Sequence, residues 1–547
     1  MSRGAWLGLA IAALAVAASI TGLNNGFVYD DQAIIVGNAH VHTLAGLAHR
    51  FIEPYWPADR GSGLYRPLTI VLFALQWAVG GGTAWIFHFV NLLLYAGLSV
   101  AVFGLARRIL PEMAAVVAAA LFAVHPVHVE AVANGVGQSE LTAALAVVVA
   151  VTLYLQWRKT QPADSLTTLR LLVLCLLYLA ACGCKEHGVV LPALLLLAEL
   201  TLVEDPRPWV SRIRSLAPSF GVLAVVGVSY LALRSWILRD VPTDIEALSW
   251  LPLTAAQRIM TALALVPEWL RLLFWPAHLQ ADYSPLETAV VTTVQPIVVV
   301  SSILLGAGVA AVILLRRKWP PGAFGAGWIA IALLPASNLL VASGQVLAER
   351  TMMLPSVGAV LLLGGMAALA MARASSARER RLTGVLPAVL IVAGLIRSAG
   401  RQPVWATDAG LRAQTVLDAP RSYWAQWIYG DWLFTHGKPA DGERHMRRAV
   451  ELYAGNPFIM RTLAIRYQDN GFCPAAAPLF TQTLQLRPLW WEVRLRLAGC
   501  LLTLGRNQAA TDVVDAGIAL GAGLGELQAF RAQPPPQPFP TTPTPPR

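Results

Sequence analysis

Long apolar runs recur through the first 400 residues of the chain, and they constrain its fold more than any other feature. Such runs can cross a hydrocarbon core about 30 Å thick as α-helices. The 547 residues are 56% hydrophobic and only 13% charged, whereas a soluble domain carries about 25% charged residues. The sequence therefore predicts an all-α, polytopic membrane protein, and it excludes a soluble globule, a disordered chain and a secreted disulfide scaffold.

Basic clusters at the ends of these runs, such as 107–108, 158–159 and 316–318, predict the topology. The expected spans, about eleven in number, are 4–23, 85–106, 112–125, 139–156, 168–184, 187–203, 216–238, 294–315, 322–336, 351–372 and 383–399. Placing every basic cluster in the cytoplasm satisfies the positive-inside rule, with the N-terminus inside. Two further apolar stretches, 67–80 and 257–276, are predicted to lie on the outer membrane surface. The net charge of +10 then has a topological cause, and we expect no nucleic-acid partner.

The last quarter of the chain has a different pattern. Gly437, Gly471 and Gly505 follow one another at intervals of 34 residues, each after an amphipathic stretch, and 34 residues is the tetratricopeptide period. The interpretation is a membrane domain over 1–400 with a first outer loop over 24–84. A short tetratricopeptide-repeat α-solenoid follows over 401–530. Such a solenoid suits an extended peptide, although a docking or dimerisation platform stays open, and 531–547 form a disordered Pro-rich tail.

Five groups of ionisable residues fall on the outer side of this topology. They are Asp30 with Asp31, Arg66, His125 with His128 and Glu130, Lys185 with Glu186, and Glu349 with Arg350. Charges are costly in a bilayer, so they call for an explanation. One carboxylate can hold a cation or a sugar hydroxyl while another accepts a proton, and the basic side chains can neutralise a phosphate. The combination indicates transfer of a group away from a lipid phosphate.

Each group also has a simpler structural interpretation. An Asp-Asp pair after an apolar run, such as Asp30-Asp31, is often a turn or a helix cap. His125 and His128 are either zinc ligands or hydrogen-bonded structural groups. Lys185 and Glu186 are compatible with an ion pair that stabilises a tight turn.

Several strings, taken together and in order, resemble a known family. They are FVYDDQAIIVGN (27–38), LYRPLTIVLFAL (64–75), FHFVNLLLY (87–95), HPVHVEAVANGVGQSEL (125–141), CKEHGVVL (184–191), LLFWPAHLQADYSP (272–285) and PASNLLVASGQVLAERTMMLPSVG (335–358). They are similar to the transmembrane and tetratricopeptide-repeat O-mannosyltransferases and their bacterial relatives, within the glycosyltransferase C superfamily. The resemblance covers about the first 360 residues, and the repeats follow as they do in the family. It departs at 137–140, Gly-Gln-Ser-Glu instead of the usual Gly-Arg-Ala-Asp, and at Met353, where an aromatic is common.

The resemblance implies the GT-C fold and an inverting transfer of a mannose-like sugar from a polyprenyl-phosphate carrier to a protein hydroxyl. It makes Asp30 the expected base and Asp31 a positioning residue or the ligand of a divalent metal, Mg²⁺ or Mn²⁺, with the reverse order open. Glu130 is the third expected catalytic residue. The remaining outer-face residues are expected to bind the substrates: Arg66, His125, His128, Lys185, Glu186, Glu349 and Arg350.

The expected location is a bacterial inner membrane, with the repeats in the periplasm. The expected partners are the membrane, a polyprenyl-phosphate sugar lipid and an acceptor protein or peptide held by the repeats. Three alternatives stay open. One is a transferase that uses the same donor on a lipid or glycan, another is a transporter, and the third is a non-enzymatic scaffold that recruits partners through its repeats.

Overall fold

The computed structural model describes residues 2–57, 63–160, 166–241, 253–284, 287, 290–340 and 345–532, and no strand occurs in these ranges. The predicted all-α class is therefore confirmed. Two compact units make up the chain: unit 1 is Met1–Ala281 with Val290–Leu411, and unit 2 is Asp282–Ala289 with Arg412–Arg547. The predicted disorder of the Pro-rich tail falls on 533–547, outside the described residues.

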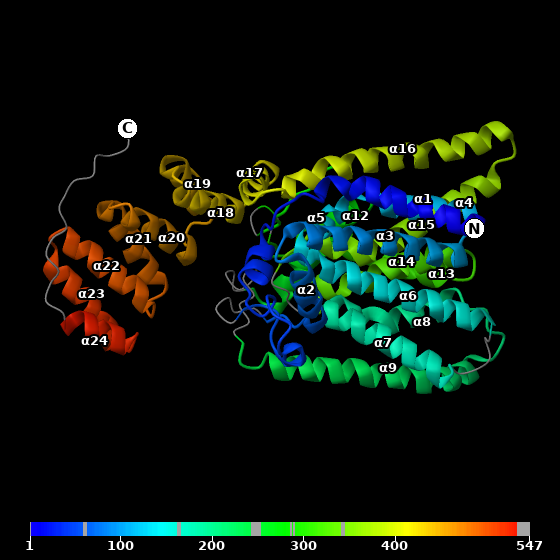
Figure 1. The fold of residues 1–547 in the computed structure, drawn as a ribbon, viewed down its shortest axis with the longest axis horizontal. Helices are drawn as coiled ribbons and strands as arrows, with labels where there is room; N and C mark the ends of the chain where they lie inside the picture. The colour runs from blue at the N-terminus through cyan, green and yellow to red at the C-terminus, as the bar shows by residue number, and fades with distance from the viewer. Residues whose placement is uncertain are drawn as a thin grey trace. The chain divides into compact units, whose positions relative to one another are not determined.

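Unit 1 is a bundle of apolar helices (Figure 1). Its helices are α1 (Arg3–Ser19), α2 (Pro67–Gly80), α3 (Ala84–Ile109), α4 (Glu112–Ala123), α5 (Val129–Ala133), α6 (Gln138–Thr160), α7 (Thr168–Cys184), α8 (Leu191–Thr201), α9 (Trp209–Ile237), α11 (Ala255–Ala264), α12 (Val266–Phe274), α13 (Pro296–Leu315), α14 (Pro320–Leu333), α15 (Met353–Arg373) and α16 (Ala377–Arg401). Helices are the required form here because lipid offers no hydrogen bonds to the backbone, so each segment must satisfy its own.

Seven helices within the described ranges are long and apolar enough to cross a membrane, and an eighth crossing arises if the bent pair Glu112–Ala123 and Pro126–Ala133 is one span. Helices also occupy the other expected spans, but they are shorter: Thr168–Cys184, Leu191–Thr201 and Pro320–Ala336. The polytopic membrane architecture is confirmed, whereas the number of eleven crossings stays a prediction. Both stretches predicted at the outer surface are helical, the first over Pro67–Gly80.

Small residues allow the helices of unit 1 to approach closely. A Cβ added at Gly325 of α14 would lie 2.7 Å from the carbonyl oxygen of Gly358 of α15, and the reverse substitution would bring the atoms to 2.6 Å. Such contacts between small residues are the usual means by which membrane helices associate. On α4, the buried alanines Ala115 and Ala119 serve the same purpose.

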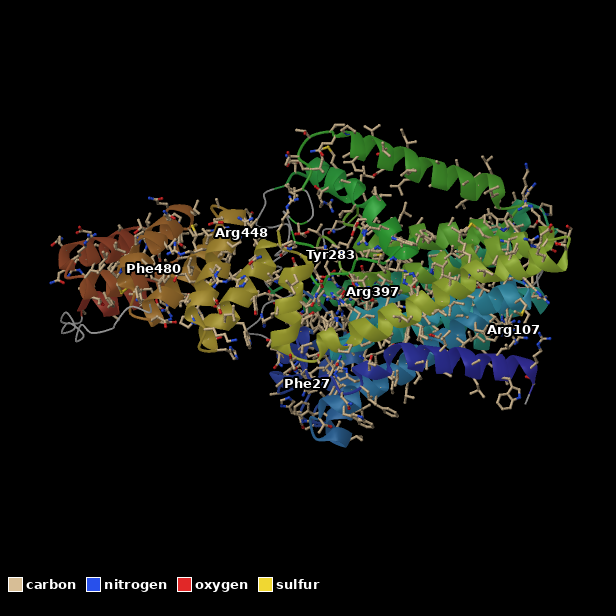
Figure 2. All side chains as sticks on the ribbon, turned by 90° about the horizontal axis from the view of Figure 1, so that it is seen from above. Phe27, Arg107, Tyr283, Arg397, Arg448 and Phe480 are labelled. Carbon is tan, nitrogen blue, oxygen red and sulfur yellow. A yellow bond between two sulfur atoms is a disulfide. The ribbon has the colours of Figure 1, made fainter. Side chains whose placement is uncertain are left out.

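The helices of unit 1 run from one end of the bundle to the other, and the charges sort between the two ends. Arg3 at the start of α1 pairs with Glu112 at the start of α4, 2.8 Å apart. Figure 2 shows Arg107 at the same end as the start of α1, whereas Phe27, beyond the end of α1, lies toward the opposite end. The end that holds Arg3 and Arg107, which we call the basic end, is thus opposite the end toward which Phe27 of the first loop lies.

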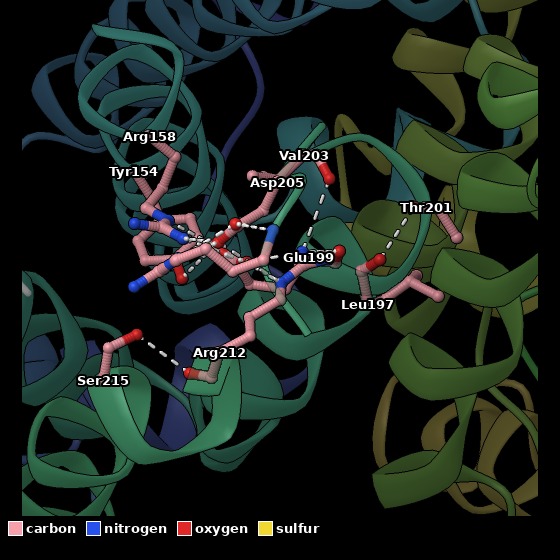
Figure 3. A network of polar contacts seen from close by, with 10 residues as sticks. Tyr154, Arg158, Leu197, Glu199, Thr201, Val203, Asp205, Arg212 and Ser215 are labelled. Carbon is pink, nitrogen blue, oxygen red and sulfur yellow. Dashed lines mark hydrogen bonds and ion pairs between the residues drawn. The ribbon is translucent and has the colours of Figure 1, made fainter. Parts of the chain in front are cut away.

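A buried ion-pair network joins α6, α8 and α9 at the basic end (Figure 3). Glu199 accepts hydrogen bonds from Arg158 Nε at 2.6 Å and from Arg212 Nη2 at 2.7 Å. The Tyr154 hydroxyl donates to the same carboxylate at 2.6 Å, and Asp205 lies 3.6 Å from Arg158. The sequence indicated only the topological role of these arginines, because their acidic partners lie on other helices.

Unit 2 contains three helix pairs. They are α18 (Tyr423–Thr435) with α19 (Pro439–Leu452), α20 (Pro457–Asp469) with α21 (Cys473–Leu486), and α22 (Trp491–Thr503) with α23 (Asn507–Ala519), followed by α24 (Leu524–Ala532). α17 (Asp408–Asp418) contains the boundary between the units. Gly437, Gly471 and Gly505 form the turn within each pair, with φ of 76°, 79° and 72°. Glycine takes this left-handed conformation without a steric penalty, which explains their 34-residue recurrence.

A disulfide joins Cys473 at the start of α21 to Cys500 near the end of α22. The other three cysteines are free, and they lie in unit 1 at 175, 182 and 184. The sequence did not reveal the disulfide, because the two cysteines are 27 residues apart and only the packing of neighbouring repeats brings them together.

Candidate active site

The two adjacent aspartates of the first loop lie in opposite environments. Asp31 is fully buried, and its carboxylate accepts hydrogen bonds from the backbone N–H groups of Val28 at 3.4 Å, Gly135 at 3.0 Å and Val136 at 2.8 Å. Burial raises the pKa of Asp31 to about 7, although the backbone donors act in the opposite direction. Asp31 therefore fastens the first loop to the turn before α6.

Backbone geometry around Asp31 requires particular residues. A Cβ at Gly135 would lie 3.0 Å from Asp31 Oδ1, and one at Gly137 would lie 2.0 Å from the carbonyl oxygen of Ala131. Tyr29 adopts a left-handed conformation with φ of 54°, which is rare for a bulky residue and occurs mainly where the surrounding structure enforces it. This turn fixes the direction in which Asp30 points.

Asp30 retains 22% of its side-chain exposure and lies 3.6 Å from Nη2 of Arg350. The same guanidinium donates to Glu130 through Nη1 at 2.5 Å, and the backbone N–H of Arg350 donates to the other oxygen of Glu130 at 2.8 Å. Arg350 therefore bridges two carboxylates that come from the first loop and from α5. Three segments far apart in the sequence meet at this point.

Two further ion pairs continue the cluster. Lys185 lies 2.7 Å from Oε1 of Glu140, and His187 Nδ1 lies 3.5 Å from Oε2 of the same carboxylate. Arg66 makes a bidentate ion pair with Glu186: its Nε and Nη2 groups donate to the carboxylate, with a shortest distance of 3.0 Å. Each cation of the predicted site thus has a carboxylate partner.

Electrostatics connect these pairs into one group. Burial lowers the pKa of Lys185, and the nearby Arg66 and Arg350 lower it further, while Glu140 and Glu186 oppose them. Burial would raise the pKa of Glu186, but Arg66 and Lys185 outweigh it and bring the value to about 2. The cluster, which we call the paired cluster, therefore keeps its ion pairs at neutral pH. Its members are Asp30, Arg66, Glu130, Glu140, Lys185, Glu186 and Arg350.

The other predicted residues have structural contacts. His125 is buried and bonds through Nε2 to the carbonyl oxygen of Leu273 at 3.0 Å. His128 is also buried, between the Tyr95 hydroxyl at 2.9 Å and Ser356 Oγ at 2.7 Å. Glu349 is buried too, and its Oε1 accepts a bond from the backbone N–H at position 280 at 2.5 Å. These three side chains hold segments of unit 1 together.

A divalent metal at Asp31 does not fit this geometry. Both carboxylate oxygens of Asp31 already accept backbone N–H groups, and the side chain has no exposed surface. Within the part of the chain that the structure describes, no group of three or more His, Cys, Asp and Glu side chains could hold a metal ion. We therefore derive no step through a metal.

Sequence reasoning did not select Glu140 as a site residue. It lies in the first turn of α6 and is 3% exposed. The available signal was a charged residue within an apolar span, which is rare without a functional or pairing role.

The fold and the paired cluster define a class: a polytopic α-helical membrane protein with an acid–base cluster at one end of its helices. Sequence comparison then identifies relatives. The chain is 38% identical to protein O-mannosyl-transferase Tmtc1 of Drosophila melanogaster over 182 residues, 32% of this chain and 21% of the relative. It is 34% identical to Tmtc2 of the same species over 277 residues, 48% of this chain and 28% of the relative.

A longer match reaches protein O-mannosyl-transferase TMTC4 of Homo sapiens, which is 26% identical over 459 residues, 74% of this chain and 61% of the relative. The homologues of this chain are thus protein O-mannosyl-transferases, and the resemblance in the sequence motifs is confirmed. The matched regions span less than two thirds of each of these three relatives.

Solved structures give weaker similarities. The archaeal oligosaccharyltransferase AglB from Archaeoglobus fulgidus, in complex with an inhibitory peptide and a dolichol-phosphate, matches with a TM-score of 0.43 and 13% identity, over 82% of this chain and 60% of that one. The mycobacterial arabinofuranosyltransferase AftD matches with a TM-score of 0.34 and 16% identity, over 80% of this chain and 29% of that one. No protein-family model matches the chain.

Proposed function

We propose that this protein is an integral-membrane glycosyltransferase. It transfers a mannose-like sugar from a polyprenyl-phosphate carrier to a protein hydroxyl, with inversion. The observation that carries the proposal is the contact of Arg350 with both Asp30 and Glu130, beside the cations Arg66 and Lys185. This combination offers a base for an attacking hydroxyl and positive charge for a leaving phosphate. The homology to protein O-mannosyl-transferases supports the choice of donor sugar and acceptor.

The chemistry follows from these side chains. The acceptor hydroxyl oxygen attacks the anomeric carbon of the sugar on the face opposite the phosphate, and Asp30 accepts the hydroxyl proton. The bond between the anomeric carbon and the phosphate oxygen breaks, and the oxygen keeps the electron pair. Polyprenyl phosphate leaves with one more negative charge, which Arg66, Lys185 and Arg350 neutralise. Displacement from the opposite face inverts the anomeric configuration.

Asp31 acts in this proposal as a positioning residue. Its bonds to the N–H groups of Gly135 and Val136 fix the turn that presents Asp30. Because both oxygens of the Asp31 carboxylate already accept backbone N–H groups, Asp30 is the better candidate for the base.

The proposed location is a bacterial inner membrane with the N-terminus in the cytoplasm and unit 2 in the periplasm. Two observations support this orientation. Arg3 and Arg107 lie at one end of unit 1, opposite the first loop, as the positive-inside rule expects of the cytoplasmic side. The Cys473–Cys500 disulfide of unit 2 suits an oxidising compartment. Unit 2 is proposed to hold the acceptor protein or peptide along its stacked helix pairs.

A variant of the proposed base tests the function. Asp30→Asn should lower sugar transfer about 100-fold or more, because a positioned general base contributes a factor of about 100 to 10,000. The assay uses membranes supplied with a radiolabelled polyprenyl-phosphate sugar and cellular acceptor proteins. Asp31→Asn should also reduce transfer, because the turn is less firmly held.

Glu112→Gln is the matched control, since Glu112 pairs with Arg3 at the opposite end of the bundle and should leave transfer unchanged. Full activity in Asp30→Asn would rule out the assigned base. Mass spectrometry of periplasmic proteins from cells with and without the gene identifies the sugar and the acceptor together. If no protein gains a hexose, a lipid or glycan acceptor replaces the protein in the proposal.

A further inference from the structure

Tyr55 lies against Arg66 of the paired cluster. It lies on the first loop, between the short helix η3 (Leu47–Ile52) and α2, and its backbone N–H donates to the carbonyl oxygen of Leu64 at 2.9 Å. The side chain is 1% exposed. It packs in a hydrophobic cluster with Ile35 of the first loop and Val136, which adjoins α6. The ring is therefore held between the two segments that Asp31 also joins.

The Tyr55 hydroxyl is buried, and no acceptor for its O–H proton occurs among the described residues. Other buried tyrosines of unit 1 are satisfied: Tyr65 donates to the carbonyl oxygen of Phe51 at 2.6 Å, and Tyr95 donates to that of Phe122 at 2.9 Å. Burying a hydroxyl without a partner destabilises a protein. The fold therefore bears a cost at Tyr55 that a bound ligand could remove.

The surroundings of the hydroxyl indicate what such a ligand would be. The Arg66 guanidinium lies 4.9 Å from the centre of the Tyr55 ring. Its bidentate ion pair with Glu186 uses the nitrogens Nε and Nη2 but not Nη1. Burial raises the pKa of Tyr55, the charge of Arg66 and its hydrogen bond to the hydroxyl oppose this effect, and Asp30 and Asp31 reinforce it. The hydroxyl thus keeps its proton and lies within electrostatic range of both the cation Arg66 and the proposed base.

We propose that the Tyr55 hydroxyl donates a hydrogen bond to a non-bridging oxygen of the donor phosphate, next to the Arg66 guanidinium. The inference rests on the proposed function, because it assigns a binding contact to the same site. A neutral hydroxyl suits this position because it adds no charge to a cluster whose cations are already paired. It can bind the phosphate both before transfer, as the sugar-linked diester, and after transfer, as the polyprenyl monophosphate. Tyr55 is then a substrate-binding residue for the phosphate of the lipid.

Tyr55→Phe tests the proposal, because it keeps the ring and the contact with Arg66 and removes only the hydroxyl. We expect the KM for the lipid donor to rise about tenfold, the usual effect of one lost hydrogen bond. The thermal midpoint of the ligand-free protein in detergent should stay unchanged or rise, because an unsatisfied buried hydroxyl is gone. A fall in the midpoint, or an unchanged KM, would overturn the proposal.

Tyr65→Phe is the matched control from the same loop. Its hydroxyl is bonded within the protein, so the variant should lower the thermal midpoint and leave the donor KM unchanged. A fall in the midpoint of Tyr65→Phe without a fall in that of Tyr55→Phe separates a structural hydroxyl from a ligand-binding one.

A binding experiment separates this inference from the proposed function. A short-chain polyprenyl phosphate without a sugar should raise the thermal midpoint of the wild-type protein, and the rise should be clearly smaller in Tyr55→Phe. If no sugar transfer is found but this difference persists, the proposed function fails and the inference stands. Equal shifts in both proteins would overturn the inference. Inorganic phosphate is the second arm, and a Tyr55-dependent shift of equal size at equal concentration would overturn the lipid as the source of the phosphate.

Discussion

At the scale of residues, Asp30 and Asp31 show how neighbours in a sequence can have separate roles. The Asp30 side chain remains partly exposed beside Arg350, whereas the Asp31 carboxylate accepts hydrogen bonds from backbone N–H groups of the segment before α6. The difference depends on Gly135 and Val136, more than 100 residues away in the sequence. This is why sequence patterns identified the pair but left the order of the two roles open.

The pKa of Asp31 predicts how stability depends on pH. Burial raises this pKa from 3.8 to about 7, so the folded chain keeps a proton that the unfolded chain loses near pH 4. Stability from this proton is fully present below about pH 4 and is lost as the pH rises to about 7. Asn cannot titrate, so the thermal midpoint of the wild type relative to Asp31→Asn should fall between pH 5 and pH 8. A constant difference between the two midpoints would contradict this prediction.

At the scale of elements, both the helices and the glycine turns of unit 2 recur with the same period. Tyr423, Pro457 and Trp491 begin the first helix of each pair at intervals of 34 residues. A left-handed glycine ends that helix each time and reverses the chain. The sequence made this arrangement predictable because period and turn residue are both local signals.

Gly505→Ala should therefore destabilise unit 2 by about 1–2 kcal/mol, because a left-handed backbone with φ of 72° strains any residue with a Cβ. Gly499→Ala is the control within the preceding helix: its Cβ would meet only Gln468 Nε2 at an ordinary 3.6 Å. It should stabilise the unit by about 0.5–1 kcal/mol. Thermal unfolding of the full chain measures both, and equal shifts would show that the turn glycine carries no conformational role.

Sequence patterns also predicted helices well where hydrophobicity and proline agree. The surface helix expected over 67–80 occupies Pro67–Gly80, because proline favours the first turn and Gly81 ends the helix in a left-handed conformation. The span expected over 112–125 ends close to the end of α4 at Ala123, but the short helix α5 that follows at an angle was not predicted. There the apolar pattern continues, and the break follows from His125 and the proline after it.

The site was less predictable than the fold. Ionisable groups on one side of a bilayer are few, so most members of the paired cluster could be listed from topology alone. Glu140 could not, because its role depends on its contact with Lys185 on a distant segment. The histidines form hydrogen bonds within unit 1, and their predicted role in substrate binding stays a prediction.

At the scale of the whole molecule, the two ends of unit 1 differ in kind. One end holds basic residues, including those bound in the Glu199 network, and the other holds the paired cluster. This asymmetry is what a single orientation in the membrane requires.

Cysteine labelling tests that orientation. Ala45→Cys lies on the exposed first loop, and Ser375→Cys lies in the exposed connection between α15 and α16. A membrane-impermeant maleimide added to spheroplasts should label the first variant readily and the second only after permeabilisation. The wild-type chain, whose three free cysteines are buried or half-buried, measures the background. Labelling in the reverse order would invert the proposed topology.

Each cation of the paired cluster is paired with a carboxylate of the protein itself, and this has a consequence for which anions the site can bind. Arg66, Lys185 and Arg350 each hold a tethered carboxylate in the place where a substrate anion would bind. An arriving anion must therefore displace an internal competitor whose effective concentration is set by the fold. A free phosphate ion has only its charge with which to displace the carboxylate. A lipid-linked phosphate also gains binding energy from its prenyl chain in the membrane. If the proposed function holds, the internal carboxylates favour a membrane-anchored phosphate over a free one.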